Sequence, residues 1–195
     1  MLGGGTLIVL SGGTAIDTVD EGTEIVSAGG TDFGAVLSAG GAQELFGTAN
    51  GVTVLSGSEQ LVESGGVASG TTVSAGGTVF VSSGGVASNT GVASGGTEIV
   101  STGGADLGAQ LFSGGTQDVF GTASGVVTLF GGNVQYVESG GAASATIING
   151  GDLQVVYFGG SDFGATLNSD VFGAAVQDVF GAATGVTVLS GSEQL

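Results

Sequence analysis

The sequence predicts an all-β fold, a single-stranded parallel β-helix of about ten coils with 16–20 residues each. The first observation is a repeat along the whole 195-residue chain: Gly-Thr/Ser-x-x-Val/Leu, a small polar link, Gly-Gly, a short spacer, then another Val, Leu or Ile. A period of this length is typical of folds that stack one unit on the next. Two columns of apolar residues and a Gly pair at each expected corner are the other two observations.

The repeat units follow one another without a break that would separate two domains. Clear copies start at Gly22, Gly57, Gly77, Gly96, Gly115, Gly132 and Gly151, and looser copies at Gly5, Gly41 and Gly191. Residues 51–61 return unchanged as residues 185–195; the first copy continues into another unit, whereas the second stops. We therefore expect residues 1–195 to form one continuous array that is a segment of a longer one.

The first strand of each coil is expected around the fifth position of the repeat, which is always apolar. This position holds Val9, Val26, Leu45, Leu61, Val81, Val100, Val119, Tyr136, Val155, Val179 and Leu195. Most of these residue types favour strands, so we expect them to form a ladder inside the rod. Strict alternation fails at the third and fourth positions, because Ile25 and Phe80 share the fourth column with Glu44 and Asp118. The pattern assigns that column to neither face.

A second strand of each coil is expected seven residues beyond the internal Gly-Gly. That position holds Leu37, Val73, Val92, Leu111, Ile148 and Leu167, which predicts a second inward ladder. Gly supplies the positive φ of tight corners, and its missing side chain lets the next coil approach closely. The same Gly residues argue against helix, where each costs roughly 0.5–1 kcal/mol.

One coil is longer than the others. The chain between Gly160 and Gln177 has about four more residues than the matching stretch between Gly104 and Gln117, and the extra residues lie near Asn168–Phe172. Insertions in repeat folds map to loops on one face, so a bulged corner loop is expected; a binding protrusion is the alternative.

Two further sets of residues recur at matching positions. Phe46, Phe120 and Phe180 each precede Gly, and we expect them to stack or to seal a corner, with an exposed aromatic stripe as the alternative. Hydroxyl residues recur at the second position, where they predict an interrupted hydroxyl row: Thr6, Thr23, Ser58, Thr78, Thr97, Thr116 and Ser192.

Composition limits the partners. The chain has 17 acidic residues and no Lys, Arg, His, Cys, Trp or Pro, for a formal net charge of −17. Without cations to neutralise phosphates it is not expected to bind nucleic acid, and an anionic membrane surface would repel it. Apolar runs such as Leu7–Leu10 are too short to cross a bilayer, so no membrane insertion by this segment is expected. The start, Met1–Gly5, lacks the basic and apolar regions of a signal peptide.

The available side chains also limit the chemistry. Catalysis that needs His, Cys or Lys is excluded, as is a zinc site built on His or Cys. We predict a non-enzymatic protein with no catalytic residue, no cofactor, no cofactor-binding residue and no metal site. A carboxylate-based glycoside hydrolase is a second alternative, with Asp118 and Glu138 on neighbouring coils as candidates. A solvated acidic face is the simpler interpretation.

Three Asp residues follow Gly-Gly-x and leave calcium binding open. Asp32, Asp106 and Asp162 lie in a sequence similar to a calcium-binding nonapeptide, but with the Asp two positions early. One carboxylate per site is few for an ion that takes six to eight oxygens, so we expect each Asp to accept backbone N–H groups at a turn. The apolar residue after each Asp is expected to plug the core: Phe33, Leu107 and Phe163.

The sequence of two segments, residues 64–90 and 137–156, resembles the AIDA-type repeats of bacterial autotransporter adhesins. The resemblance touches nearly the whole chain, although the Phe-Gly-Thr-Ala coils depart from the usual unit. It implies a right-handed parallel β-helix exported to the cell surface, with roles in adhesion, self-association and biofilm formation. It also implies Ser and Thr residues that carry heptose in some members, without singling out any residue here.

These observations lead to one main functional hypothesis and one alternative from another class. The main hypothesis is an extracellular or cell-surface adhesin repeat region that acts as a stalk or display surface. Its expected partners are further copies, end to end or side by side, or host and bacterial surface glycans and proteins. The alternative is a filament subunit that stacks through exposed β-helix ends.

Overall fold

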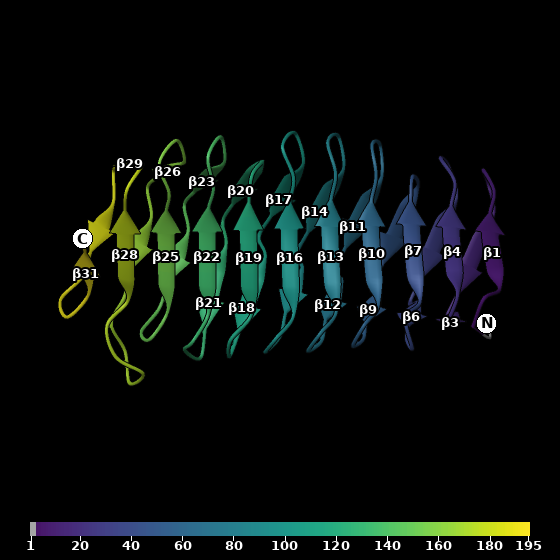
Figure 1. Cartoon of the computed structure of the whole chain (residues 1–195), viewed down its shortest axis with the longest axis horizontal. Helices are drawn as coiled ribbons and strands as arrows, with labels where there is room; N and C mark the ends of the chain where they lie inside the picture. Colours follow the sequence, from purple (N-terminus) through teal and green to yellow (C-terminus); the bar gives the residue numbers. More distant parts are fainter. Residues whose placement is uncertain (1–2) are drawn as a thin grey trace.

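The computed structural model describes residues 3–195, which form a rod of stacked coils (Figure 1). The two ends of the chain lie at opposite ends of the rod, with the coils side by side between them. Met1 and Leu2, which belong to the segment judged unlike a signal peptide, lie outside the described residues. The described residues contain strands and turns but no helix, so none of them forms a helix that could cross a membrane.

Three parallel sheets run along the rod; each complete coil gives one strand to each, and the last strand belongs to sheet A alone. Sheet A has eleven strands: β1 (Thr6–Val9), β4 (Thr23–Val26), β7 (Ala42–Leu45), β10 (Glu59–Val62), β13 (Thr78–Val81), β16 (Thr97–Val100), β19 (Thr116–Val119), β22 (Val134–Val137), β25 (Leu153–Val156), β28 (Val176–Val179) and β31 (Glu193–Gln194). Sheet B has ten: β2 (Thr14–Ile16), β5 (Thr31–Phe33), β8 (Thr48–Asn50), β11 (Val67–Ser69), β14 (Val86–Ser88), β17 (Ala105–Leu107), β20 (Thr122–Ser124), β23 (Ala142–Ser144), β26 (Ser161–Phe163) and β29 (Ala182–Thr184). Sheet C has ten: β3 (Val19–Asp20), β6 (Val36–Leu37), β9 (Thr53–Val54), β12 (Thr72–Val73), β15 (Gly91–Val92), β18 (Gln110–Phe112), β21 (Val127–Leu129), β24 (Ile147–Ile148), β27 (Thr166–Leu167) and β30 (Thr187–Val188).

This arrangement confirms the predicted all-β parallel solenoid of about ten coils. The predicted second ladder is confirmed on sheet C, where all six of its members are fully buried. Val26, Val81 and Val100 of the first ladder are also fully buried. They belong to the last position of each four-residue strand of sheet A, which we call the valine column: Val9, Val26, Leu45, Val62, Val81, Val100, Val119, Val137, Val156 and Val179.

The prediction was wrong for four members of the first ladder. Leu61, Tyr136 and Val155 lie one residue before the valine column, in the third position of their strands, and Leu195 is 67% exposed. Val155 is nevertheless buried, with 6% of its surface exposed, so for this residue only the column was wrong. Each of these repeat copies carries one extra residue between its first Gly and its strand: Ser58, Asn133, Asp152 and Ser192. Because side chains alternate with a period of two, one inserted residue moves the inward set by one position.

The Gly pairs form the corners as predicted, and the two residues of a pair have different roles. Gly65 has φ +83°, a conformation that L side chains rarely adopt. Gly66 donates its N–H to the carbonyl of Glu63 at 2.8 Å and closes the turn. A Cβ on Gly66 would overlap the carbonyl oxygen of Leu45 in the preceding coil. The first Gly therefore permits the turn, and the second permits close contact between coils.

The second position of each sheet A strand also faces inward, and it is mostly polar. The side chains of these strands therefore do alternate, although the sequence pattern suggested that alternation fails. We call this second position the amide column: Leu7, Glu24, Gln43, Gln60, Val79, Glu98, Gln117, Gln135, Gln154, Gln177 and Gln194. Each Gln donates its Nε2 to the side-chain oxygen of the residue one coil earlier, as Gln135 does to Gln117 at 2.7 Å and Gln154 does to Gln135 at 2.7 Å. Except at Gln194 in the last coil, these hydrogen bonds satisfy Gln side chains that are fully buried.

The long segment folds as a corner loop. Asp170 and Gly173 exchange backbone hydrogen bonds, and the Asp170 side chain accepts the N–H of Phe172 at 2.7 Å. Phe172 lies over the backbone of Gly131 and Gly151, and Val171 at the tip is 94% exposed. The bulged loop is confirmed, and its role as a protrusion stays a prediction.

Candidate functional site

The outer surface of the rod differs from sheet to sheet. Acidic side chains point outward from strands of sheet A alone: Glu44, Glu59, Asp118, Asp178 and Glu193. In the described chain, no strand of sheet B or sheet C carries an outward-facing charge. Sheet B presents Thr, Ser, Ala, Val and Asn with a few larger apolar residues, and sheet C presents mostly Val, Ile and Thr. The strands of the rod therefore form one acidic face and two uncharged ones, and the remaining accessible carboxyl groups lie at the corners: Asp17, Glu21, Glu63, Glu138 and Asp170.

The acidic face is less acidic than composition suggests, because seven carboxyl groups are buried. Asp20, Glu24, Asp32, Glu98, Asp106, Asp152 and Asp162 are at most 2% exposed. The solvated acidic face expected for Asp118 and Glu138 therefore describes only part of the carboxyl groups of the chain. In the sequence, the one sign that these side chains are buried is that they recur at fixed positions of the repeat.

The three Asp residues considered for calcium point into the core. Asp32, Asp106 and Asp162 occupy the middle of their sheet B strands, where the other coils carry Ala. Asp106 accepts the backbone N–H of Ala109 at 3.4 Å, as predicted for a turn, and also a buried Gln side chain. No cluster of three or more acidic side chains suited to a metal occurs among residues 3–195.

The apolar residues after these Asp residues do not plug the core. Phe33, Leu107 and Phe163 are 45%, 51% and 68% exposed and point outward from sheet B. The alternation of a strand decides this: if the Asp faces inward, the next residue must face outward. The prediction was wrong because it assumed that the apolar residue of the pair would be inside.

Aromatic residues form two short stacks in the described chain, one of which pairs Phe112 with Phe130 at 6.3 Å between ring centroids. Tyr136 and Tyr157 stack with ring centroids 6.0 Å apart, and Tyr157 and Phe180 stack at 6.4 Å. Phe46 and Phe120 lie on coils further along the rod and are 38% and 39% exposed. The predicted stacking among the three Phe residues is replaced by a stack of Phe180 on Tyr157, which stacks in turn on Tyr136.

The hydroxyl row is interrupted, as the sequence predicted, and is shorter than expected. Thr6, Thr23, Thr78, Thr97 and Thr116 share the outward first position of sheet A strands. Ser58 and Ser192 precede their strands and do not belong to the row.

The two carboxylates proposed for glycoside hydrolysis do not face each other across a cleft. Asp118 points outward from β19, where its register partner is Tyr136, whereas Glu138 follows β22 at the next corner. Burial raises the pKa of the Asp118 carboxyl. No hydrogen bond is found between the two side chains in the described structure.

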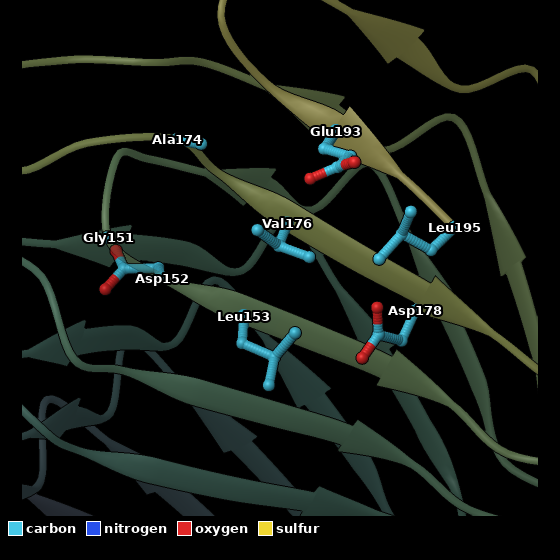
Figure 2. A pocket seen from close by; sticks show the side chains of 8 residues that line it. All are labelled: Gly151, Asp152, Leu153, Ala174, Val176, Asp178, Glu193 and Leu195. Atoms are coloured by element: carbon cyan, nitrogen blue, oxygen red, sulfur yellow. The ribbon is translucent and has the colours of Figure 1, made fainter.

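An open hollow of about 510 Å³ lies on the outer face of sheet A, across β25, β28 and β31 (Figure 2). It is lined by Gly151, Asp152, Leu153, Ala174, Val176, Asp178, Glu193 and Leu195. Figure 2 shows Leu153, Val176 and Leu195 between the acidic side chains, so the floor is apolar and the carboxylates are dispersed. This lining offers a mixed contact surface without a grouped set of reactive side chains.

Comparison with known proteins agrees with this geometry. The family model described as "Adhesin of bacterial autotransporter system, probable stalk" matches residues 46–96. The crystal structure of a TibC-catalysed hyper-glycosylated TibA fragment, residues 55–350, superposes with a TM-score of 0.93 at 33% identity, over 100% of this chain and 72% of that one. The chain belongs to the AIDA-type family of autotransporter adhesins.

Other comparisons add nothing to this assignment. An alginate lyase from Paenibacillus sp. str. FPU-7 covers 99% of this chain at 11% identity, with a TM-score of 0.37, and carries no argument. A search of curated protein sequences gave no match. Membership of the AIDA-type family identifies this rod as an adhesin-related passenger region, for which a secreted or cell-surface location follows. The informative comparisons are with adhesins and not with enzymes.

Proposed function

We propose that this rod is a cell-surface stalk whose uncharged sides mediate contact between neighbouring rods and thereby between cells. The observation that carries the proposal is the distribution of charge around the rod. Outward-facing strand carboxylates lie on sheet A, whereas sheets B and C carry none in the described residues. Two copies of a chain with a formal net charge of −17 repel each other over most orientations. The electrostatic repulsion between two copies is smallest when their uncharged faces meet.

The stalk role rests on the shape. Ten coils in one continuous stack separate the two ends of the chain by the full length of the rod (Figure 1). Every coil is hydrogen-bonded to its neighbours through three sheets. The rod is therefore stiff and keeps its two ends at a fixed separation. Adhesion, aggregation and biofilm formation are the processes that such a surface would serve.

Agglutination of beads that carry the chain tests this function. Beads coated with the chain are expected to clump and to adhere to cultured cells, whereas uncoated beads stay dispersed. A double variant, S69E/S88E, places two charges in register on the outer face of sheet B and should reduce clumping several-fold. The matched control, T97E/T116E, places two charges in register on sheet A and should leave clumping unchanged. Wild-type beads that neither clump nor adhere would remove the proposal.

End-to-end assembly is the second candidate. It is favoured by the position of β1 and β31 as the outermost strands of sheet A, each with one backbone edge that pairs with no described strand. Electron microscopy over a concentration series distinguishes the two candidates. Lateral contact gives bundles of constant rod length, whereas end-to-end contact gives filaments that lengthen with concentration.

A further inference from the structure

In two layers of the core, a Glu on sheet A and an Asp of the same coil on sheet B are joined by a Gln of the next coil. In one layer, Gln117 Nε2 donates to Glu98 Oε2 at 2.8 Å and to Asp106 Oδ2 at 3.1 Å. The other layer repeats this arrangement four coils earlier. There, a single Gln amide nitrogen donates to Glu24 Oε2 at 2.7 Å and to Asp32 Oδ2 at 3.2 Å.

Half of the carboxyl oxygens in these layers lack a partner. Glu24 Oε1, Asp32 Oδ1, Glu98 Oε1 and Asp106 Oδ1 are buried and accept no hydrogen bond. The four side chains are at most 1% exposed. A buried ionised carboxylate without full hydrogen bonding is strongly disfavoured, and two in one layer are disfavoured further. The chain has no Lys, Arg or His that would compensate the charge.

A third layer of the same rod shows how the arrangement is completed when Gln replaces the Glu. Gln154 Nε2 lies 3.4 Å from Asp162 Oδ1, and Gln177 Nε2 lies 3.2 Å from Asp162 Oδ2. Both oxygens of Asp162 therefore have a donor. In the two layers that contain Glu, the corresponding amide N–H is missing. A proton on one of the two carboxyl groups would supply the donor instead.

We propose that the Glu24–Asp32 and Glu98–Asp106 pairs are two proton-binding sites in the core of the rod, each of which retains one proton at neutral pH. In each site one carboxyl is a neutral acid whose O–H supplies the missing donor. The other carboxyl stays ionised and accepts the amide N–H. The pair loses this proton only when both groups ionise, and the folded rod then carries an uncompensated charge in its core.

The surroundings of the Glu98–Asp106 pair contain no further titratable group. Val79 of the preceding coil and the hydroxyl of Thr90 lie against Glu98. Gln117 and the backbone N–H of Ala109 face Asp106. Burial, followed by the neighbouring Asp106 charge, raises the pKa of Glu98, and burial raises the pKa of Asp106.

The Glu24–Asp32 pair has one additional acidic neighbour. Asp20, fully buried on β3, adds a negative charge that opposes ionisation of both groups, and Leu7 and Ala15 lie below them in the preceding coil. Burial is the largest cause that raises the pKa of Glu24, to about 7, and it also raises the pKa of Asp32.

The direction of the resulting pH dependence follows from these shifts. A raised carboxyl pKa means that the folded state binds protons that the unfolded state has released. The stabilisation is therefore complete below the unfolded value, 4.5 for Glu24, and is lost as the pH rises through the folded value of about 7. For each proton that only the folded state retains, the unfolding equilibrium constant rises about tenfold for every unit by which the pH increases in that range.

Urea unfolding at pH 5, 6, 7 and 8, followed by far-ultraviolet circular dichroism, tests the proposal. The wild type should become less stable with rising pH. E24Q and E98Q each give their layer the Gln–Asp pair of the Gln154 layer and should each remove about a tenfold change per pH unit. The double variant should keep only the weak slope due to Asp118 and to the single buried carboxyls Asp32, Asp106 and Asp162. Q154E creates a third pair with Asp162 and should steepen the slope. E59Q, which changes an exposed carboxyl of sheet A, should leave it unchanged.

A second measurement does not depend on how well the variants fold. Infrared spectroscopy of the wild type at pH 7 should show the carbonyl stretch of a protonated carboxylic acid, and the E24Q/E98Q variant should lack it. A wild-type stability that is flat from pH 5 to pH 8, or no protonated-acid band, overturns the proposal. Stabilisation by sodium or calcium ions that the two Gln variants abolish also overturns it, because a metal ion would then compensate the charge.

Discussion

The two inward columns of sheet A lie two residues apart on the same strands, yet they hold the coils together differently. The valine column and the amide column are both buried, except near the ends of the rod at Leu7, Val179 and Gln194. Val81, Val100 and Val119 contribute apolar area, which has no direction, so a layer needs nothing specific from its neighbour. The Gln residues donate to the coil before them and accept from the coil after them, so each one depends on the residue one layer away.

The difference explains where Glu occurs in the amide column. Glu24 and Glu98 each begin a run of hydrogen-bonded side chains, and the coil before them presents Leu7 or Val79, which has no acceptor. An amide at that place would direct a donor at an apolar side chain. A directional column therefore needs a special residue at its start, whereas a non-directional column does not.

The largest expected effect comes from placing a charge in the apolar column. Val100→Asp introduces a carboxyl into a layer where no donor is available, and should cost about 4 kcal/mol or more of unfolding free energy. Val100→Ala, which leaves only a small cavity, should cost about 2 kcal/mol. Urea unfolding of both variants measures the difference. Equal losses would mean that the valine column tolerates polarity as the amide column does.

The next effect breaks the amide column at its centre. Gln135→Leu removes the acceptor of Gln154 and Thr146 and the donor to Gln117, and should cost about 3 kcal/mol because these buried groups lose their partners. Gln110→Leu, an exposed change on sheet C, is the control and should change the unfolding free energy by less than about 0.5 kcal/mol. A neutral result at position 135 would show that water or rearrangement satisfies the column.

A smaller effect concerns the coil spacing on which both columns depend. Gly66→Ala places a methyl group against the Leu45 carbonyl and should cost about 2 kcal/mol. Ser64→Ala in the same turn is exposed and should be nearly neutral. Hydrogen exchange should locate the loss of protection in the two coils that Gly66 separates. Protection lost evenly along the rod would contradict a local spacing role.

The smallest effect would make the two columns more alike. Val79 interrupts the amide column between Gln60 and Glu98. Val79→Gln should donate to Gln60 and present its oxygen to a protonated Glu98, with a net gain of up to about 1 kcal/mol. The gain should be present at pH 5 and should fall as the pH rises through about 8, the value to which burial raises the pKa of Glu98. A gain that is independent of pH would contradict the protonated state of Glu98.

The repeat alone predicted the stacked strands, the corners and most of the apolar interior. Val26 and Leu37 are buried because the transfer of an apolar side chain out of water is favourable. This free energy is a property of each residue by itself. The positions of Leu61 and Tyr136 were missed because a single inserted residue shifts the alternation. Such a shift is visible only when the strand pairing is known.

The polar interior was decided by the tertiary structure. Glu24, Gln43 and Asp32 are polar, and sequence patterns place polar residues outside unless a partner is evident. Their partners lie on another strand of the same coil or one coil away, and they meet only after the coils close and stack. Burial of an apolar side chain needs no partner, whereas burial of a polar one does. For this reason the sequence by itself determined the rod and its apolar ladders, and only the folded structure determined which carboxyl and amide groups fill its core.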